Sequence, residues 1–258
     1  MPRNVLINTK SLIILDFLII NKGVIIMTIK KFSFNIYMTC ILLSLLIAII
    51  YAFYYLKKDK IDKRLLWLST TMIIPFTLVG GLMLSYITSP VKDLSFLSLG
   101  FSSYGGAIGL IAAVLIYEKI SEVKEIKYRY IISIPLIYSI SKLGCFFAGC
   151  CYGIPYNGPL YVYYPNIIKV KLFPIQLLES IVFLIIFVII NIVYNKYKNK
   201  YIIEYTIIIG AIAKFLLDFL RYSHLNIILS VNQWISIILV IVTLIILLKQ
   251  IYNQKNPK

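Results

Sequence analysis

The sequence has little charge, one histidine and four cysteines, and each scarcity excludes a class of protein. Only 14% of its 258 residues are charged and 60% are hydrophobic, which excludes a soluble globular domain. Four cysteines without an even, extracellular spacing pattern do not indicate a disulfide scaffold. With His224 as the single histidine, the ligands are too few for a metal site, so we expect no metal and no organic cofactor.

Acidic residues are scarce as well: ten of them stand against 26 basic residues, which gives a formal charge of +16. A charge of this size is typical of nucleic-acid binding, but here the lysines stand in short blocks between apolar runs. We therefore expect the partner to be a lipid bilayer and expect no nucleic acid.

The sequence does have long apolar runs. A helix of about 20 residues crosses roughly 30 Å of hydrocarbon, and these runs lack the polar alternation of a barrel strand. The pattern predicts an all-α integral membrane protein with seven transmembrane helices. They are expected at Ile36–Leu56, Leu65–Ile87, Leu97–Tyr117, Tyr130–Cys150, Leu177–Tyr194, Ile202–Leu220 and Gln233–Leu248.

Positive charge predicts the orientation of these spans. The connectors 57–64, 118–129 and 195–200 and the tail after Leu248 hold five, four, three and three basic residues, and the opposite connectors hold one or two each. Cytoplasmic loops carry the excess of lysine and arginine. We therefore predict that the N-terminus lies outside and the C-terminus is cytoplasmic.

Residues 1–31 fit this scheme poorly. The stretch "SLIILDFLIINKGVIIM" is apolar but short, and it contains an acid, an asparagine and a lysine. We expect an N-terminal extension ahead of a true start at Met27, or an interfacial helix, rather than an eighth span or a signal peptide. The seven-helix domain then covers residues 32–248, and residues 249–258 form a cytoplasmic tail.

Once each span has a direction, the depth of its polar and charged residues in the bilayer can be estimated. Such residues from six segments fall at the same depth, in the outer half of the bilayer. Charge buried in lipid costs about 3 kcal/mol or more, so this convergence predicts a polar cavity that faces the outer leaflet. Its cations suit an anionic lipid headgroup. The residues at this level are Tyr37, Tyr104, Lys142, Gly149, Gly153, Gln176, Glu179, Lys214, Asp218, Arg221 and Gln233.

Structural roles compete with function for these residues. Lys214 could pair with Asp218 at i,i+4 spacing, and Lys142 with Glu179, so that both pairs hold the bundle together. The glycines could serve close helix packing. His224 is expected to be a solvated loop residue.

The three cysteines at the end of the fourth span have two interpretations. Cys145, Cys150 and Cys151 are either small hydrophobic residues or reactive thiols near Lys142. The sequence leaves both open.

Seven segments carry a family resemblance: "FNIY", "LVGGL", "SYGGAIG", "KLGCFFAGCCYG", "FPIQLLE", "KFLLDFLR" and "SVNQWIS". In this order they resemble the signatures of the bacterial prolipoprotein diacylglyceryl transferases, over nearly all of residues 32–248. The resemblance implies a multi-pass enzyme of the bacterial plasma membrane. It implies transfer of the diacylglyceryl group of phosphatidylglycerol to the lipobox cysteine thiol of a prolipoprotein signal peptide, with release of glycerol phosphate.

This sequence departs from the family pattern at six positions. Tyr104 and Phe173 stand where the family has histidine, Lys142, Lys214 and Leu82 where it has arginine, and Cys145 where it has asparagine. Lysine keeps the positive charge of arginine but not its bidentate grip on phosphate. Removal of the thiol proton then falls to Tyr104, to Lys142 or to the phosphate itself.

The resemblance assigns roles to the residues that converge. Tyr104 and Lys142 are the expected catalytic residues, and Lys142, Lys214 and Arg221 are expected to hold the phosphoglycerol headgroup. Tyr37, Gly149, Gly153, Gln176, Glu179, Asp218 and Gln233 complete the expected binding site. Two alternatives stay open: a paralogue that binds phospholipid without this activity, or one that transfers to another acceptor through Cys150 or Cys151.

Overall fold

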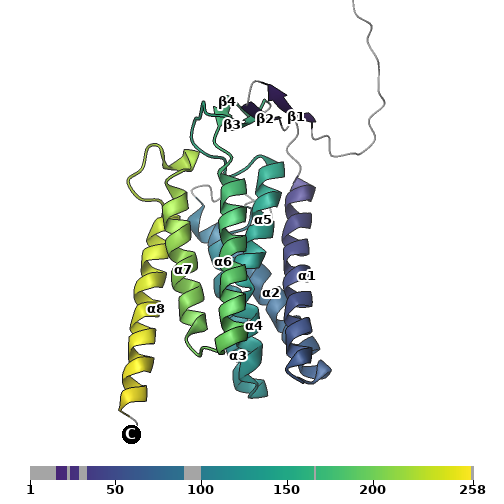
Figure 1. Cartoon of the computed structure of the whole chain (residues 1–258), viewed down its shortest axis with the longest axis vertical. Coiled ribbons are helices and arrows are strands. Elements are labelled where there is room, and N and C mark those ends of the chain that lie inside the picture. Colours follow the sequence, from purple (N-terminus) through teal and green to yellow (C-terminus); the bar gives the residue numbers. More distant parts are fainter. Residues whose placement is uncertain (1–15, 22–23, 29–33, 90–99, 166, 257–258) are drawn as a thin grey trace, which may run out of the picture.

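The computed structural model describes residues 16–21, 24–28, 34–89, 100–165 and 167–256, and its helices stand side by side in a bundle (Figure 1). The helices are α1 (Phe34–Lys58), α2 (Lys63–Thr88), α3 (Ser103–Ser121), α4 (Lys124–Ile132), α5 (Ile134–Ala148), α6 (Ile175–Tyr197), α7 (Ile202–Asp218) and α8 (Val231–Lys255). A single 3₁₀ turn at Tyr222–His224 connects α7 to α8.

Six helices in the described part of the chain are long and apolar enough to cross a membrane, with α4 and α5 counted together as Lys124–Ala148. The prediction of a mostly helical membrane protein is therefore confirmed. The predicted span Ile202–Leu220, the sixth, corresponds to α7, which has 17 residues and is shorter than the six helices counted above.

The helix ends differ from the predicted spans by several residues. The last helix was expected to end at Leu248 but continues to Lys255. The fourth span was expected to reach Cys150, but α5 ends at Ala148 because Gly149 takes the left-handed conformation of a helix cap. The predicted start of the third span, Leu97, lies outside the described residues, and α3 begins at Ser103.

A four-stranded sheet covers one end of the bundle (Figure 1). Its order is β1-β2-β3-β4, with strands β1 (Asp16–Asn21), β2 (Val24–Thr28), β3 (Leu160–Tyr164) and β4 (Ile168–Leu172). The β1–β2 and β3–β4 pairs are antiparallel, and β2 runs parallel to β3. Buried Val162, Tyr164 and Leu172 pack on Phe146 of α5, so the sheet is anchored to the bundle.

The sheet corrects two expectations. No strand was predicted, and the described part of residues 1–31 forms β1 and β2 rather than an interfacial helix. Each strand contains two isoleucines, a residue type that favours strands when a partner is available. The partner is β3, more than 130 residues away, and the local pattern gives no sign of it.

Helices α2 and α3 are in close backbone contact through glycines. A Cβ atom on Gly109 would collide with the carbonyl oxygen of Phe76, and one on Gly105 with that of Gly80. Small residues of this kind allow helix backbones in membranes to approach closely. Gly105 and Gly109 thus have the packing role that the sequence left open for its glycines.

The bundle has two unlike ends. The sheet, the connection between α5 and α6 and the connection between α7 and α8 lie at one end (Figure 1). The C-terminus and the basic connectors lie at the other end. We call the first the sheet end.

Candidate active site

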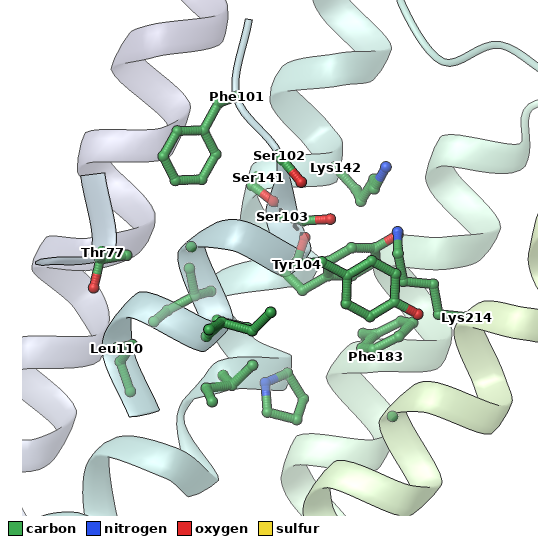
Figure 2. Close-up of a pocket in the computed structure, with 18 of the residues that line it drawn as sticks. Thr77, Phe101, Ser102, Ser103, Tyr104, Leu110, Ser141, Lys142, Phe183 and Lys214 are labelled. Atoms are coloured by element: carbon green, nitrogen blue, oxygen red, sulfur yellow. Dashed lines mark hydrogen bonds between the residues drawn. The ribbon is translucent and has the colours of Figure 1, made fainter. Parts of the chain in front are cut away.

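A cavity of about 310 Å³ lies within the bundle, and seven helices contribute to its walls: α1, α2, α3, α5, α6, α7 and α8. Most of its lining is apolar, with residues such as Leu110 and Phe183. Tyr104, Lys142 and Lys214 also line it (Figure 2). The cavity therefore joins an apolar wall to a group of buried charges.

Glu179 of α6 is the centre of the buried charges. Its Oε1 accepts hydrogen bonds from Arg221 Nη2 at 2.6 Å and from the Tyr138 hydroxyl at 2.8 Å. Its Oε2 lies 3.1 Å from Lys142 Nζ. The expected pair of Lys142 and Glu179 is therefore confirmed, and one carboxylate holds cations from two separate segments.

Lys214 of α7 does not form the expected pair with Asp218. Its Nζ donates to the Tyr138 hydroxyl at 3.0 Å and lies over the rings of Tyr104 and Tyr138, 4.9 and 4.7 Å from their centroids. Asp218 instead lies 3.3 Å from Arg221 Nε and accepts a hydrogen bond from Ser230. Among the described residues, no carboxylate lies within ion-pair distance of Lys214.

The cluster carries more positive than negative charge. Its three cations are Lys142, Lys214 and Arg221, and its two carboxylates are Glu179 and Asp218; all five residues are buried. With every group ionised the sum is +1. A buried surplus of positive charge beside a cavity favours an anionic ligand.

Tyr104 lies in the first turn of α3, whose start is fixed by Ser102. The Ser102 hydroxyl accepts from the Gly105 amide at 3.4 Å, and the Tyr104 hydroxyl is hydrogen-bonded to Ser236 of α8. Tyr37 of α1 also lines the cavity, and its hydroxyl donates to the Phe101 carbonyl oxygen at 3.2 Å.

Two buried glutamines hold the loops around the cavity. Gln176 at the start of α6 donates to the Cys150 carbonyl oxygen at 2.8 Å and to the Tyr164 hydroxyl at 3.4 Å. Gln233 closes a capping box at the start of α8, where its Oε1 accepts from the Ser230 amide at 2.8 Å. Neither glutamine is among the cavity-lining residues, so they position the loops rather than the ligand.

The two expected site glycines have steric roles. Gly149 has φ +68°, and Gly153 forms an antiparallel bridge with Arg221. A Cβ atom on Gly153 would collide with the Phe173 carbonyl oxygen. These contacts bring the loop after α5 against the segment that carries Arg221.

The model of one protein family matches residues 24–249, and its description is "Prolipoprotein diacylglyceryl transferase". The chain belongs to this family. A phosphatidylglycerol–prolipoprotein diacylglyceryl transferase from Clostridium tetani is 28% identical over 184 residues, which are 64% of this chain and 74% of that protein. The enzyme of the same name from Chloroherpeton thalassium is 27% identical over 187 residues, 67% of this chain and 69% of that protein.

Family membership confirms three predictions made from the sequence. The resemblance to the diacylglyceryl transferases is correct, and the chain belongs to a transferase family. Together with its apolar helices, this makes it a multi-pass protein of a bacterial plasma membrane. The family does not test the roles of individual residues, which stay predictions.

Sequence reasoning missed Tyr138 and misjudged His224. Tyr138 touches Glu179 and Lys214 and lines the cavity; its spacing of four residues from Lys142 on one helix was the available signal. His224 was expected to be solvated. It is instead half-buried, with Nε2 2.7 Å from Gln233 Oε1.

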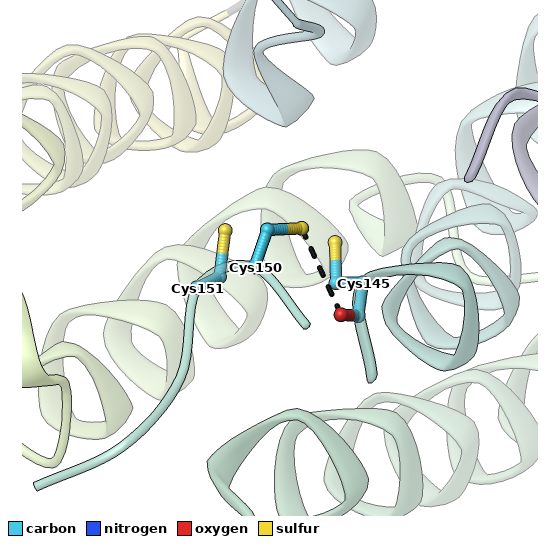
Figure 3. Close-up of side chains that lie close together, drawn as sticks. All are labelled: Cys145, Cys150 and Cys151. Atoms are coloured by element: carbon cyan, nitrogen blue, oxygen red, sulfur yellow. Dashed lines mark hydrogen bonds between the residues drawn. The ribbon is translucent and has the colours of Figure 1, made fainter. Parts of the chain in front are cut away.

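The three cysteines after the middle of α5 lie close together. Cys145 and Cys151 line the cavity, and the Cys150 thiol donates to the Cys145 carbonyl oxygen at 3.7 Å (Figure 3).

Proposed function

We propose that this chain transfers the diacylglyceryl group of phosphatidylglycerol to the lipobox cysteine thiol of a prolipoprotein signal peptide. The observation that carries the proposal is the surplus positive charge of the buried cluster beside an apolar cavity. One molecule with an anionic headgroup and two acyl chains matches both features. The family and the names of both relatives favour this activity over binding alone or transfer to another acceptor.

Lys214 is the cation best suited to the headgroup phosphate. It lines the cavity and, within the part of the chain that the structure describes, its hydrogen-bond partner is a neutral hydroxyl, whereas Lys142 and Arg221 are each paired with a carboxylate. Phosphate can take a second hydrogen bond from Lys142 or Arg221, since both also line the cavity. As the bond to the glyceryl carbon breaks, negative charge grows on the phosphate, and these cations stabilise it.

The acceptor thiol must lose its proton before its sulfur attacks the glyceryl carbon. Lys142 is engaged with Glu179 as a cation, which favours a role in binding phosphate rather than in removing a proton. Tyr104 remains the residue we assign to the reacting groups, because its side chain lines the cavity and its hydroxyl bonds to a neutral partner, Ser236.

We propose that the eight helices form seven membrane spans, with α4 and α5 together as one span, the N-terminus outside, the C-terminus cytoplasmic and the site facing the outer leaflet. A helix of 17 residues such as α7 is roughly 25 Å long, close to the thickness of the hydrocarbon layer. The basic connectors lie opposite the sheet end, which by the charge rule makes the sheet end the outer one. Lipid and secreted precursor then reach the cavity from the same side.

Mass spectrometry of a synthetic lipobox peptide tests the proposal. The purified protein, given phosphatidylglycerol in detergent, should add one diacylglyceryl group to the peptide cysteine. Lys142→Ala should lower the rate at least tenfold, which corresponds to about 1.4 kcal/mol of lost transition-state stabilisation. Lys196→Ala, an exposed lysine at the opposite end of the bundle, is the matched control and should leave the rate unchanged. No peptide product from protein that binds phosphatidylglycerol would refute the proposed transfer.

A further inference from the structure

Three of the four cysteines form a cluster that the proposed reaction does not explain. The Sγ atoms of Cys145, Cys150 and Cys151 all lie within 4.8 Å of one another (Figure 3). All three are free thiols, and the fourth cysteine, Cys40, is not part of the group. We call these three residues the thiol trio.

The spacing of the thiol trio fits a metal ion. With Zn–S bonds of about 2.3 Å, three thiolates around one ion stand roughly 3.8 to 4.0 Å apart. Sulfurs within 4.8 Å of one another reach that geometry through side-chain shifts of about 1 Å or less. Thiolates select thiophilic ions such as Zn²⁺ over hard cations such as Mg²⁺. A site with three sulfur ligands needs no histidine, so the scarcity of histidine in this chain does not exclude it.

The backbone holds the trio in this arrangement. Cys151 has φ +53°, a left-handed conformation that is costly for a residue with a side chain and persists where the surroundings impose it. Gln176 is fully buried and donates to the Cys150 carbonyl oxygen at 2.8 Å, so it holds the peptide group that precedes Cys151. The loop after α5 therefore places the thiols of Cys150 and Cys151 close to that of Cys145.

The trio also borders the cavity. Cys145 and Cys151 are both among its lining residues; Cys145 is buried, whereas Cys151 is exposed. Catalytic zinc sites characteristically have three protein ligands and a fourth position open to water or substrate. An ion held by the trio would therefore have its free position on the cavity side.

We propose that Cys145, Cys150 and Cys151 bind one thiophilic d¹⁰ ion of the Zn²⁺ class, whose fourth coordination position accepts an incoming thiol from the cavity. The proposed metal site follows from the geometry of the thiol trio alone. The incoming thiol at the fourth position rests on the proposed function as well. Cys145 occupies the position at which the family resemblance implies asparagine, so the site is a property of this chain rather than of the family pattern.

The bound ion would favour loss of the proton from the incoming thiol. This chain has no histidine in the cavity for that task, whereas the family pattern has one. A thiol that coordinates a metal ion is deprotonated, and its proton passes to solvent. The sulfur then forms a bond to the glyceryl carbon while the bond between that carbon and the phosphate oxygen breaks. Glycerol phosphate leaves with the electron pair, and the thioether product, a weaker ligand, is released. No oxidant or reductant is needed.

Zinc binding by the full-length protein tests the metal site without any substrate. Protein purified in detergent under reducing, anaerobic conditions is loaded with Zn²⁺, freed of excess metal and analysed for zinc content and by X-ray absorption. We expect one zinc per chain with three sulfurs at about 2.3 Å. Each of Cys145→Ser, Cys150→Ser and Cys151→Ser should lower the affinity at least tenfold, and Cys40→Ser should not. Equal zinc content in the wild type and in the triple serine variant would overturn the site.

Adding the lipobox peptide tests the fourth position. The number of sulfurs around zinc should rise from three to four, and a chelator should stop modification of the peptide until Zn²⁺ is restored. Full transfer by the chelated protein would overturn the role of the open position and leave the proposed function intact. A zinc-loaded protein that coordinates the peptide thiol but never modifies it would overturn the proposed function and support the site.

Discussion

At the scale of the residue, Glu179 decides whether the cavity can hold its cations. It is fully buried and contacts Arg221, Lys142 and Tyr138 at the same time. Leaving a buried charge without its partner costs far more than an intact pair contributes. The Glu179 network therefore stabilises the buried cations, which can then bind an anionic ligand.

Glu179→Gln should destabilise the protein by about 3 kcal/mol, because it leaves two buried cations facing a neutral amide. Thermal unfolding in detergent measures the effect as a lower Tm. Glu118→Gln is the matched control: its pair with Lys127 is partly exposed, so its loss should cost under about 1 kcal/mol. Equal losses in the two variants would contradict the role given to Glu179.

At the scale of the element, α2 and α3 depend on glycines for contact. Gly109→Ala should lower the Tm by several degrees, because its Cβ atom meets the Phe76 carbonyl oxygen. Gly210→Ala in α7 is the matched control: its nearest neighbour is Phe183 Cε1 at 3.8 Å, and alanine favours a helix by about 1 kcal/mol over glycine. We expect this control to be neutral or stabilising; a lower Tm in the control than in Gly109→Ala would show that close helix contact is not the cause.

The helices could be predicted because each is a long apolar run bounded by charge, and hydrophobicity over a whole run outweighs local preferences. The left-handed cap at Gly149 shifted one boundary by two residues, which no apolar pattern reveals. Strand β2 could not be predicted, because its partner strand β3 lies more than 130 residues away in the sequence and the local pattern does not indicate the pairing.

Of the two ion pairs expected among the candidate site residues, the sequence predicted one correctly and the other wrongly. Depth along each span brought Lys142 and Glu179 to one level, and the structure pairs them. Depth alone could not show that Lys214 bonds to Tyr138 rather than to Asp218, since helix rotation decides which side chains meet. His224 was misjudged because its contact with Gln233 depends on how the connection between α7 and α8 folds back.

At the scale of the whole molecule, the proposed orientation makes the sheet end the outer one. In a background with all four cysteines changed to serine, Asn157→Cys should react with a membrane-impermeant maleimide added to intact spheroplasts. Lys200→Cys, at the other end of the bundle, should react only after the membrane is opened. Both positions are exposed, so accessibility to solvent does not separate them. The reverse pattern of labelling would invert the proposed orientation.

In the proposed reaction, one phospholipid molecule transfers its diacylglyceryl group to one thiol in this cavity. The most direct measurement is the ratio of glycerol phosphate released to peptide modified, with purified protein, phosphatidylglycerol and lipobox peptide. We expect a ratio of one, and no glycerol phosphate when the peptide cysteine is replaced by serine. Release of glycerol phosphate without modified peptide would mean that water is the acceptor, as in a phospholipase C type of hydrolysis, and the absence of both products would contradict the transferase.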